Sequence, residues 1–231
     1  MKSIHFKLII LFFTSSYFLM AQQNDDWGSM LTLEVVKKIT SDFSVGLEGE
    51  HRSRANFTEN ERWNIDSYLR YDLCKHVTIG GGFTYIYYSH LTKGWENRYR
   101  WLAHITGEYP IGDFKFSLRE RFQSTEREGV SEYNKKNERV RANPKFVLRS
   151  RLEVEYDVPK SHFEPFLSVE FFHKLNHPDE NGLDKVRYSI GTAYKITKSH
   201  SITAFFRYID SQDIDEDDCS KILSLGYKFK F

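Results

Sequence analysis

Serine and histidine stand next to each other at two places, where they could supply a nucleophile and a base. Ser89 precedes His90, and Ser199, His200 and Ser201 follow one another. A hydrolytic site needs both groups on one face, with a third polar group to orient the base. Neighbouring residues of a strand point to opposite faces, so neither pair forms a dyad if these segments are strands. We therefore predict no catalytic residue, and a barrel hydrolase acting on lipid or peptide is kept as an alternative.

Possible metal ligands occur at two further places. His173 and His177 lie four residues apart, but in a strand-to-loop segment rather than on a helix, which makes a metal site weak. Residues 213–218 are rich in carboxylates. We interpret them as a solvated loop tip, with loose binding of a divalent cation as the alternative. We predict no metal site and no cofactor.

Charged residues make up 28% of the chain, and many recur at every second position of segments whose other positions are apolar. The formal net charge of +1 gives no reason to expect a nucleic-acid partner. The alternating positions that we take as candidate functional residues are Arg70, Arg98, Arg100, Arg119, Arg121, Arg149, Arg151, Arg187, Glu48, Glu50, Glu108, Glu153, Glu155 and Glu170.

Alternation with a period of two indicates that β-strands position these charges, because helical side chains repeat every 3.6 residues. Most of the segments are about ten residues long, which is the length that a tilted strand needs to cross a bilayer. We expect strands over residues 27–38, 43–53, 62–72, 77–89, 98–109, 114–123, 145–156, 164–174, 185–197, 201–210 and 220–231.

The expected connections alternate between short turns and longer polar loops, as they do in outer-membrane barrels. The longer loops cover residues 54–61, 90–97, 124–144, 175–184 and 211–219. The sequence therefore predicts an all-β fold, an antiparallel up-and-down transmembrane β-barrel of 10–12 strands. Single-chain bacterial barrels have an even number of strands, so we expect a wall of 10 or 12 rather than the eleven segments that the pattern shows.

The apolar face carries aromatic residues near the strand ends and aliphatic residues between them. Trp and Tyr favour the membrane interface, so we expect outer-membrane lipid to surround this face. Glu120 interrupts it and is expected near the interface, where a carboxylate costs least. In the alternative fold, a soluble periplasmic β-barrel that binds a ligand, the aromatic face would point inward. The expected lipid-interface girdle is Trp63, Tyr71, Tyr87, Tyr99, Trp101, Tyr109, Tyr156, Phe229 and Phe231.

The charged face would line the lumen, and two interpretations of it stay open. Charges of both signs on neighbouring strands could pair into a ladder that braces the wall. The surplus of basic groups could instead line a water-filled path that favours anionic solutes. The expected function is accordingly a small, passive, porin-like channel or a structural barrel.

The first 21 residues have the features of a signal peptide. Lys2 and Lys7 are followed by an apolar run over residues 8–13, and Ala21 offers a small residue for cleavage. We expect residues 22–231 to form one barrel domain in a bacterial outer membrane. Cys74 and Cys219 are expected at opposite ends of a wall about 25 Å tall, so we predict that both are unpaired.

Two segments carry a family resemblance. The chain ends in Leu223-Ser-Leu225-Gly-Tyr227-Lys-Phe229-Lys-Phe231, which resembles the terminal strand that the barrel-assembly machinery recognises. Trp27, Leu31-Thr-Leu33-Glu-Val35 and Phe43-Ser-Val45-Gly-Leu47 resemble the opening of the domain-of-unknown-function 2490 family. The resemblance covers essentially the whole predicted mature chain. It implies an exported, one-domain outer-membrane barrel and no activity, and the resemblance of the terminal strand implies the assembly machinery as a partner.

Overall fold

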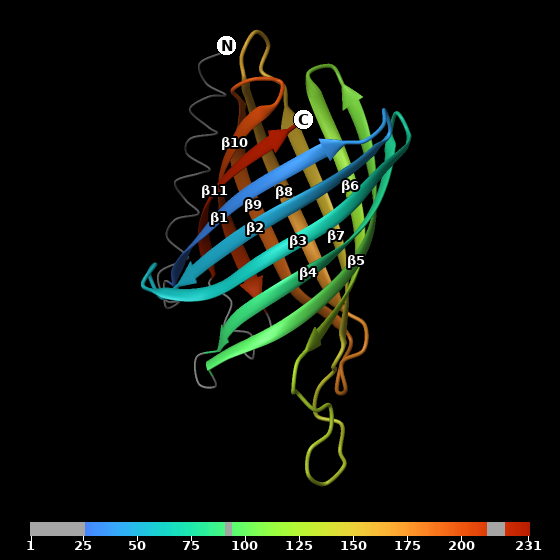
Figure 1. Cartoon of the computed structure of the whole chain (residues 1–231), viewed down its shortest axis with the longest axis vertical. Helices are drawn as coiled ribbons and strands as arrows, with labels where there is room; N and C mark the ends of the chain where they lie inside the picture. Colours follow the sequence, from blue (N-terminus) through green and yellow to red (C-terminus); the bar gives the residue numbers. More distant parts are fainter. Residues whose placement is uncertain (1–25, 91–93, 212–219) are drawn as a thin grey trace, which may run out of the picture.

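The computed structural model describes residues 26–90, 94–211 and 220–231. In these ranges the chain forms eleven strands that close into one barrel, and Figure 1 shows the strands inclined to its long axis. The predicted signal peptide lies outside the described residues, among which no helix is long and apolar enough to span a membrane. The strands are β1 (Trp27–Lys38), β2 (Phe43–Arg54), β3 (Glu59–Cys74), β4 (Val77–His90), β5 (Gly94–Ile111), β6 (Phe114–Arg127), β7 (Lys145–Tyr156), β8 (Phe163–Lys174), β9 (Gly182–Lys195), β10 (His200–Ser211) and β11 (Lys221–Lys230).

Barrel closure corrects the expected even strand number. Ten strand pairs are antiparallel, and an odd set of such strands leaves the first and last strands running the same way. β1 and β11 accordingly pair in parallel, from Trp27 opposite Lys221 to Val36 opposite Lys230. Eleven strands lie within the predicted range of 10–12, but the preference for 10 or 12 is wrong for the described residues, because a parallel ladder closes the barrel as well as an antiparallel one.

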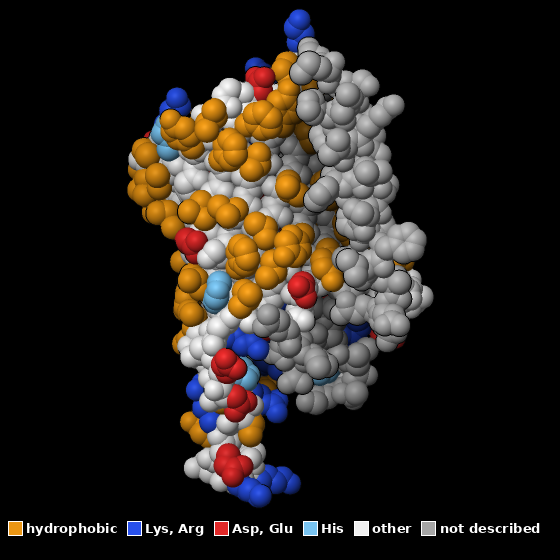
Figure 2. All heavy atoms as spheres, turned by 180° about the vertical axis from the view of Figure 1, so that it is seen from behind, with side chains coloured by type: hydrophobic (Ala, Val, Ile, Leu, Met, Phe, Trp, Pro, Cys, Tyr) orange, Lys and Arg blue, Asp and Glu red, His pale blue; other side chains and the backbone are white. Residues whose placement is uncertain are grey.

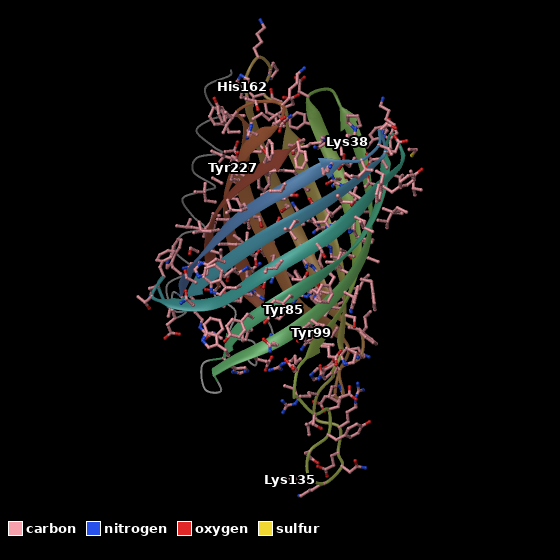
Figure 3. All side chains as sticks on the ribbon, viewed as in Figure 1. Lys38, Tyr85, Tyr99, Lys135, His162 and Tyr227 are labelled. Carbon is pink, nitrogen blue, oxygen red and sulfur yellow. The ribbon has the colours of Figure 1, made fainter. Side chains whose placement is uncertain are left out.

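The two ends of the barrel differ, and we call them the turn end and the loop end. Residues 39–42, 75–76, 112–113, 157–162 and 196–199 connect strands at the turn end. Figure 3 places Lys38 and His162 toward that end and Lys135 at the tip of the long segment 128–144, which projects from the loop end. Four predicted loops are shorter than expected, because β3 begins at Glu59, β5 at Gly94 and β9 at Gly182, and β6 ends at Arg127.

Large apolar side chains cover the outside of the wall. Leu33, Trp101 and Tyr109 are 67%, 64% and 63% exposed, whereas the side chains of Glu61 and Arg54 are 1% and 4% exposed. Figure 2 shows apolar side chains spread over the wall, with charged ones mostly on the projecting loop and at the opposite end of the barrel. The aromatic face thus points outward, opposite to what a soluble ligand-binding barrel needs. Of the expected girdle, Trp63, Tyr71, Tyr87, Trp101, Tyr109 and Phe231 are exposed, and Tyr99, Tyr156 and Phe229 are half-buried.

Candidate functional site

The loop-side half of the lumen is filled by inward-facing side chains. Ile86, Tyr88 and Phe172 are 1%, 4% and 3% exposed. The Phe172 ring lies close to two guanidinium groups, with Arg149 at 4.5 Å and Arg187 at 4.4 Å from its centroid. Cation–π contacts of this kind strengthen when water is excluded. This half of the lumen is therefore a packed constriction.

Ion pairs seal the same half from the β2–β3 side. The Arg52 guanidinium donates to both oxygens of Glu50 at 2.8 and 3.1 Å, and Asn64 donates to Glu50 at 2.5 Å. Arg62 and Glu61 pair at 2.8 Å. All four charged side chains are less than 10% exposed. Buried charges in proteins are normally paired in this way, and this part of the lumen fits the predicted ladder.

The turn-side half of the lumen is open by comparison. It holds a cavity of about 370 Å³. Cationic side chains near the turn end reach water, since Lys115, Lys195 and Lys228 are 41%, 56% and 39% exposed. We call this cavity the vestibule, and its charged lining residues are Glu34, Glu48, Asp66, Arg70, Glu108, Arg119, Arg121, Arg151, Glu153 and Lys228.

Four arginines form a block on the β6–β7 wall. In the strand register Arg119 lies directly opposite Arg151, and Arg121 lies opposite Arg149, so like charges face each other across the two strands. Glu170 on β8 neutralises part of the block, because it accepts hydrogen bonds from Arg119 at 2.9 Å and from Arg149 at 2.8 and 3.2 Å. Like charges at directly opposed positions destabilise a sheet, so stability alone does not explain this arrangement.

A row of three carboxylates stands on the β1–β3 wall of the vestibule. In the strand register Glu34 lies opposite Glu48 on β2, and Glu48 lies opposite Asp66 on β3. The Tyr68 hydroxyl donates to Glu34, and its ring lies over Gly46, where an added Cβ would come within 2.1 Å of the ring. Glycine at position 46 therefore makes room for Tyr68 to reach across β2. Carboxylates thus cluster on the β1–β3 wall, where Lys228 pairs with Glu34 at 3.1 Å, and arginines cluster on the β6–β7 wall, where Glu153 and Glu170 pair with some of them.

Three other candidate charges lie near the two ends of the lumen. Arg98 pairs with Glu96 at 2.6 Å near the loop end, and Arg100 donates to Thr125 at 3.0 Å. Glu155 pairs with Lys115 at 2.7 Å near the turn end. By register the candidate charges share the inward face. That face also contains Tyr68, His104 and Lys228, which our candidate set omitted although their period-two positions alternate with the apolar face.

Within the described residues, His200 forms no dyad with Ser199 or Ser201. The His200 ring hydrogen-bonds to the Tyr227 hydroxyl at 2.6 Å rather than to either neighbouring serine. Within residues 26–90, 94–211 and 220–231, no three His, Cys, Asp or Glu side chains could together hold a metal ion. Cys74 is an exposed free thiol at the end of β3, whereas Cys219 and the acidic segment 213–218 lie outside the described residues.

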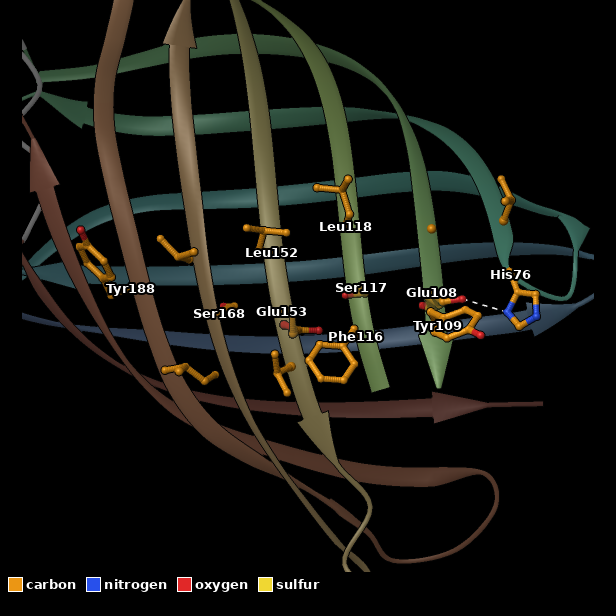
Figure 4. Close-up of a pocket in the computed structure, with 15 residues that line it drawn as sticks. His76, Glu108, Tyr109, Phe116, Ser117, Leu118, Leu152, Glu153, Ser168 and Tyr188 are labelled. Atoms are coloured by element: carbon orange, nitrogen blue, oxygen red, sulfur yellow. Dashed lines mark hydrogen bonds between the residues drawn. The ribbon is translucent and has the colours of Figure 1, made fainter. Parts of the chain in front are cut away.

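The outside of the wall has a hollow and a polar pair. Figure 4 shows the hollow, about 730 Å³, where Gly107 has no side chain to fill the space between strands. Elsewhere on the β6–β7 wall the Ser150 hydroxyl donates to Glu120 at 2.7 Å. Glu120 is the middle one of the outward positions of β6, not an end position, and its depth in the membrane stays a prediction.

Comparisons with known proteins agree with the barrel. A family model described as "Protein of unknown function (DUF2490)" matches residues 27–219. A solved structure of the NanC porin is 14% identical with a TM-score of 0.53, and the match covers 89% of this chain and 99% of that chain. OmpT of Vibrio cholerae is 13% identical with a TM-score of 0.40, over 74% of this chain and 51% of that chain. No curated protein sequence matches. The likeness to the NanC porin shows a shared barrel fold.

Proposed function

The chain belongs to the DUF2490 family, and for this member we propose an outer-membrane barrel that acts as a narrow passive channel favouring small anions. The outer surface supports the membrane location. Apolar side chains such as Leu33 and Ile65 are more than half exposed between aromatic residues, and such a surface is stable only against lipid. The predicted signal peptide is in keeping with export.

The C-terminal strand is the proposed contact with the barrel-assembly machinery. Phe231 is 55% exposed, and its ring stacks on Phe229 at 5.4 Å. The backbone of Phe231 is already tied to β1, because its N–H donates to Val36 at 3.0 Å and its carbonyl accepts from Lys38 at 3.0 Å. The side chain therefore stays available while the seam is closed, and replacing Phe231 should slow assembly more than it destabilises the folded barrel.

The cluster of four arginines on the β6–β7 wall is the observation that carries the channel proposal. Opposite charges face each other where Lys115 is opposite Glu155, as in a structural ladder, but like charges face each other where Arg119 is opposite Arg151. Glu34 and Glu48 are a second like-charge pair. Rings or walls of arginine confer anion preference in pores. Eleven strands lie between the eight that side chains fill and the 16–18 of wide porins, so the expected channel is narrow.

Conductance in a planar bilayer tests this proposal. The refolded protein should give small current steps, and a salt gradient should give a reversal potential showing chloride preferred over potassium. Arg151→Gln should move that potential toward zero, and Glu48→Gln on the opposite wall should move it further toward anion preference. A current without ion preference, unchanged by both substitutions, would contradict the role of the charged walls.

A closed barrel is the second candidate, and the packed constriction favours it. Ile86, Tyr88 and Phe172 leave almost no exposed surface on the loop side, and a lumen filled in this way passes no ions. In that case the vestibule is a pocket open toward the turn end only. The absence of any current above background, from protein that migrates in a gel as a folded barrel, would favour this candidate over the channel.

A further inference from the structure

The arginine block has an energetic problem that the protein's own carboxylates do not solve. Arg119, Arg121, Arg149 and Arg151 occupy four neighbouring positions on β6 and β7. Glu170 accepts hydrogen bonds from two of them, and the carboxylate of Glu153 pairs with Arg151. Arg121 is left over. Among the described residues its Nε is shielded from solvent and has no hydrogen-bond partner.

The strand register surrounds Arg121 mainly with cationic side chains, and the nearby carboxylate of Glu170 already accepts hydrogen bonds from Arg119 and Arg149. His104 lies directly opposite it on β5, with a shielded and unpartnered Nδ1, and the Nε of Arg119 is also shielded and unpartnered. Burying a guanidinium without an acceptor is costly. A wall with this surplus of N–H donors is complementary to an oxyanion, whose oxygens accept two parallel hydrogen bonds from each arginine fork.

The vestibule provides the space for such a group. Arg119, Arg121 and Arg151 line the same cavity of about 370 Å³, together with His104. That volume admits a small solute but no large chain, since ligand pockets begin at about 300 Å³. The carboxylates Glu34 and Glu48 line the opposite wall, so a bound anion is attracted to one side of the lumen and repelled from the other.

We propose that the Arg119–Arg121–Arg151 wall is a binding site for the phosphate or carboxylate group of a small solute. This inference deepens the proposed channel by naming its solute class, and it rests on the proposed barrel orientation. Binding itself does not need an open pore, because the vestibule is reached from the turn end. The oxyanion takes the place of the acceptor that Arg121 lacks.

Thermal unfolding of the refolded protein in detergent tests the site, with sodium phosphate and sodium acetate each compared with sodium chloride at equal ionic strength. Phosphate and acetate should raise the unfolding temperature in a saturable way, and chloride should not. Arg121→Gln should weaken the apparent affinity about tenfold or more, as expected for loss of a charge-assisted pair. Lys115→Gln, which removes a lumen cation already paired with Glu155, is the matched control and should leave it unchanged.

The outcomes separate this site from the channel. Saturable stabilisation without current supports the site and rejects the channel, whereas anion-favouring current without saturable stabilisation does the reverse. Arg121→Gln should also unfold at a higher temperature than the parent protein in chloride alone, because it removes one of four crowded like charges. Equal stabilisation by chloride, or an unchanged affinity in Arg121→Gln, would overturn the proposal. If Arg121→Gln does not refold, Arg121→Lys is the second variant. It keeps the positive charge but loses the guanidinium that donates two parallel hydrogen bonds, so it should still weaken binding.

Discussion

Glu170→Gln is the sharpest perturbation of the lumen, because one carboxylate holds the arginine block together. Glu170 accepts three hydrogen bonds, two of them from Arg149 and one from Arg119, at 2.8 to 3.2 Å. Its side chain is 8% exposed, and those of Arg119 and Arg149 are 19% and 12% exposed. On the next strand Arg187 stands directly opposite Glu170. Glutamine keeps the shape and removes the charge that faces these guanidinium groups.

The expected loss of unfolding free energy follows from this burial. Removing one partner of a buried ion pair costs about 3–5 kcal/mol, because the other charge stays buried without compensation. Water in the adjacent vestibule screens Arg119 in part, so we expect the lower end of that range, about 3 kcal/mol. The matched control is Glu155→Gln, whose partner Lys115 is 41% exposed. An exposed pair of this kind contributes at most about 1 kcal/mol.

The assay is urea unfolding of the refolded protein in phosphatidylcholine vesicles, followed by tryptophan fluorescence. The buffer contains neither phosphate nor carboxylate, since either could occupy the arginine block. Glu170→Gln should lower the midpoint markedly at an unchanged slope, and Glu155→Gln should leave it nearly unchanged. Equal midpoints for the two variants would refute the argument that Glu170 neutralises a buried cationic cluster.

Three further predictions concern the constriction, the outer wall and the projecting loop. Phe172→Ala opens the loop-side packing, so it should raise the single-channel conductance. It should also lower the unfolding free energy by about 3–5 kcal/mol. An unchanged conductance would place the narrowest point of the lumen elsewhere. Glu120→Leu removes a carboxylate from the lipid-facing wall and should stabilise the barrel by about 1 kcal/mol in vesicles. This is less than the roughly 2–4 kcal/mol that a lysine or arginine costs at the bilayer midplane, because Asp and Glu cost less there. A destabilised variant would refute the placement of Glu120 against lipid. Glu132 accepts hydrogen bonds from the backbone N–H of Asn143 at 2.9 Å and from the Arg139 guanidinium, and these hold the pKa of Glu132 below its ordinary value. The two hydrogen bonds therefore order the loop fully above about pH 4.3. Their contribution is lost as the pH falls through the lowered pKa. A nitroxide at position 135 should be immobile at neutral pH and mobile in strong acid, and a probe equally mobile in the parent protein and in Glu132→Gln at neutral pH would contradict this.

The sequence was sufficient for the barrel because its signal repeats in every strand. A residue such as Leu69 must face away from Arg70 in any extended chain, and the bounds of β1 and β7 match the predicted ranges. The number of strands was not predictable in the same way. Local alternation does not report which strand closes the barrel, and the parallel β1–β11 seam depends on contacts between the two ends of the chain.

The charged lumen was predicted as a face but not as an arrangement. Period-two spacing puts Arg121 and Glu48 on the inward side, yet only the strand register shows that Arg121 faces Arg149 and that Glu48 faces Asp66. The packed constriction was likewise unpredictable, because Ile86 and Phe172 occupy the charged face and give no signal of their own. Register and side-chain size, rather than composition, therefore decide how open the lumen is.

Quenching of tryptophan fluorescence by brominated lipids tests the central claim, that the apolar face meets lipid and the charged face is enclosed. In a variant whose sole tryptophan is Trp101, which is 64% exposed on the outer wall, bromine on the acyl chains should quench most of the emission, and aqueous iodide should quench little. Strong quenching by iodide with none by the brominated lipids would contradict this orientation of the barrel.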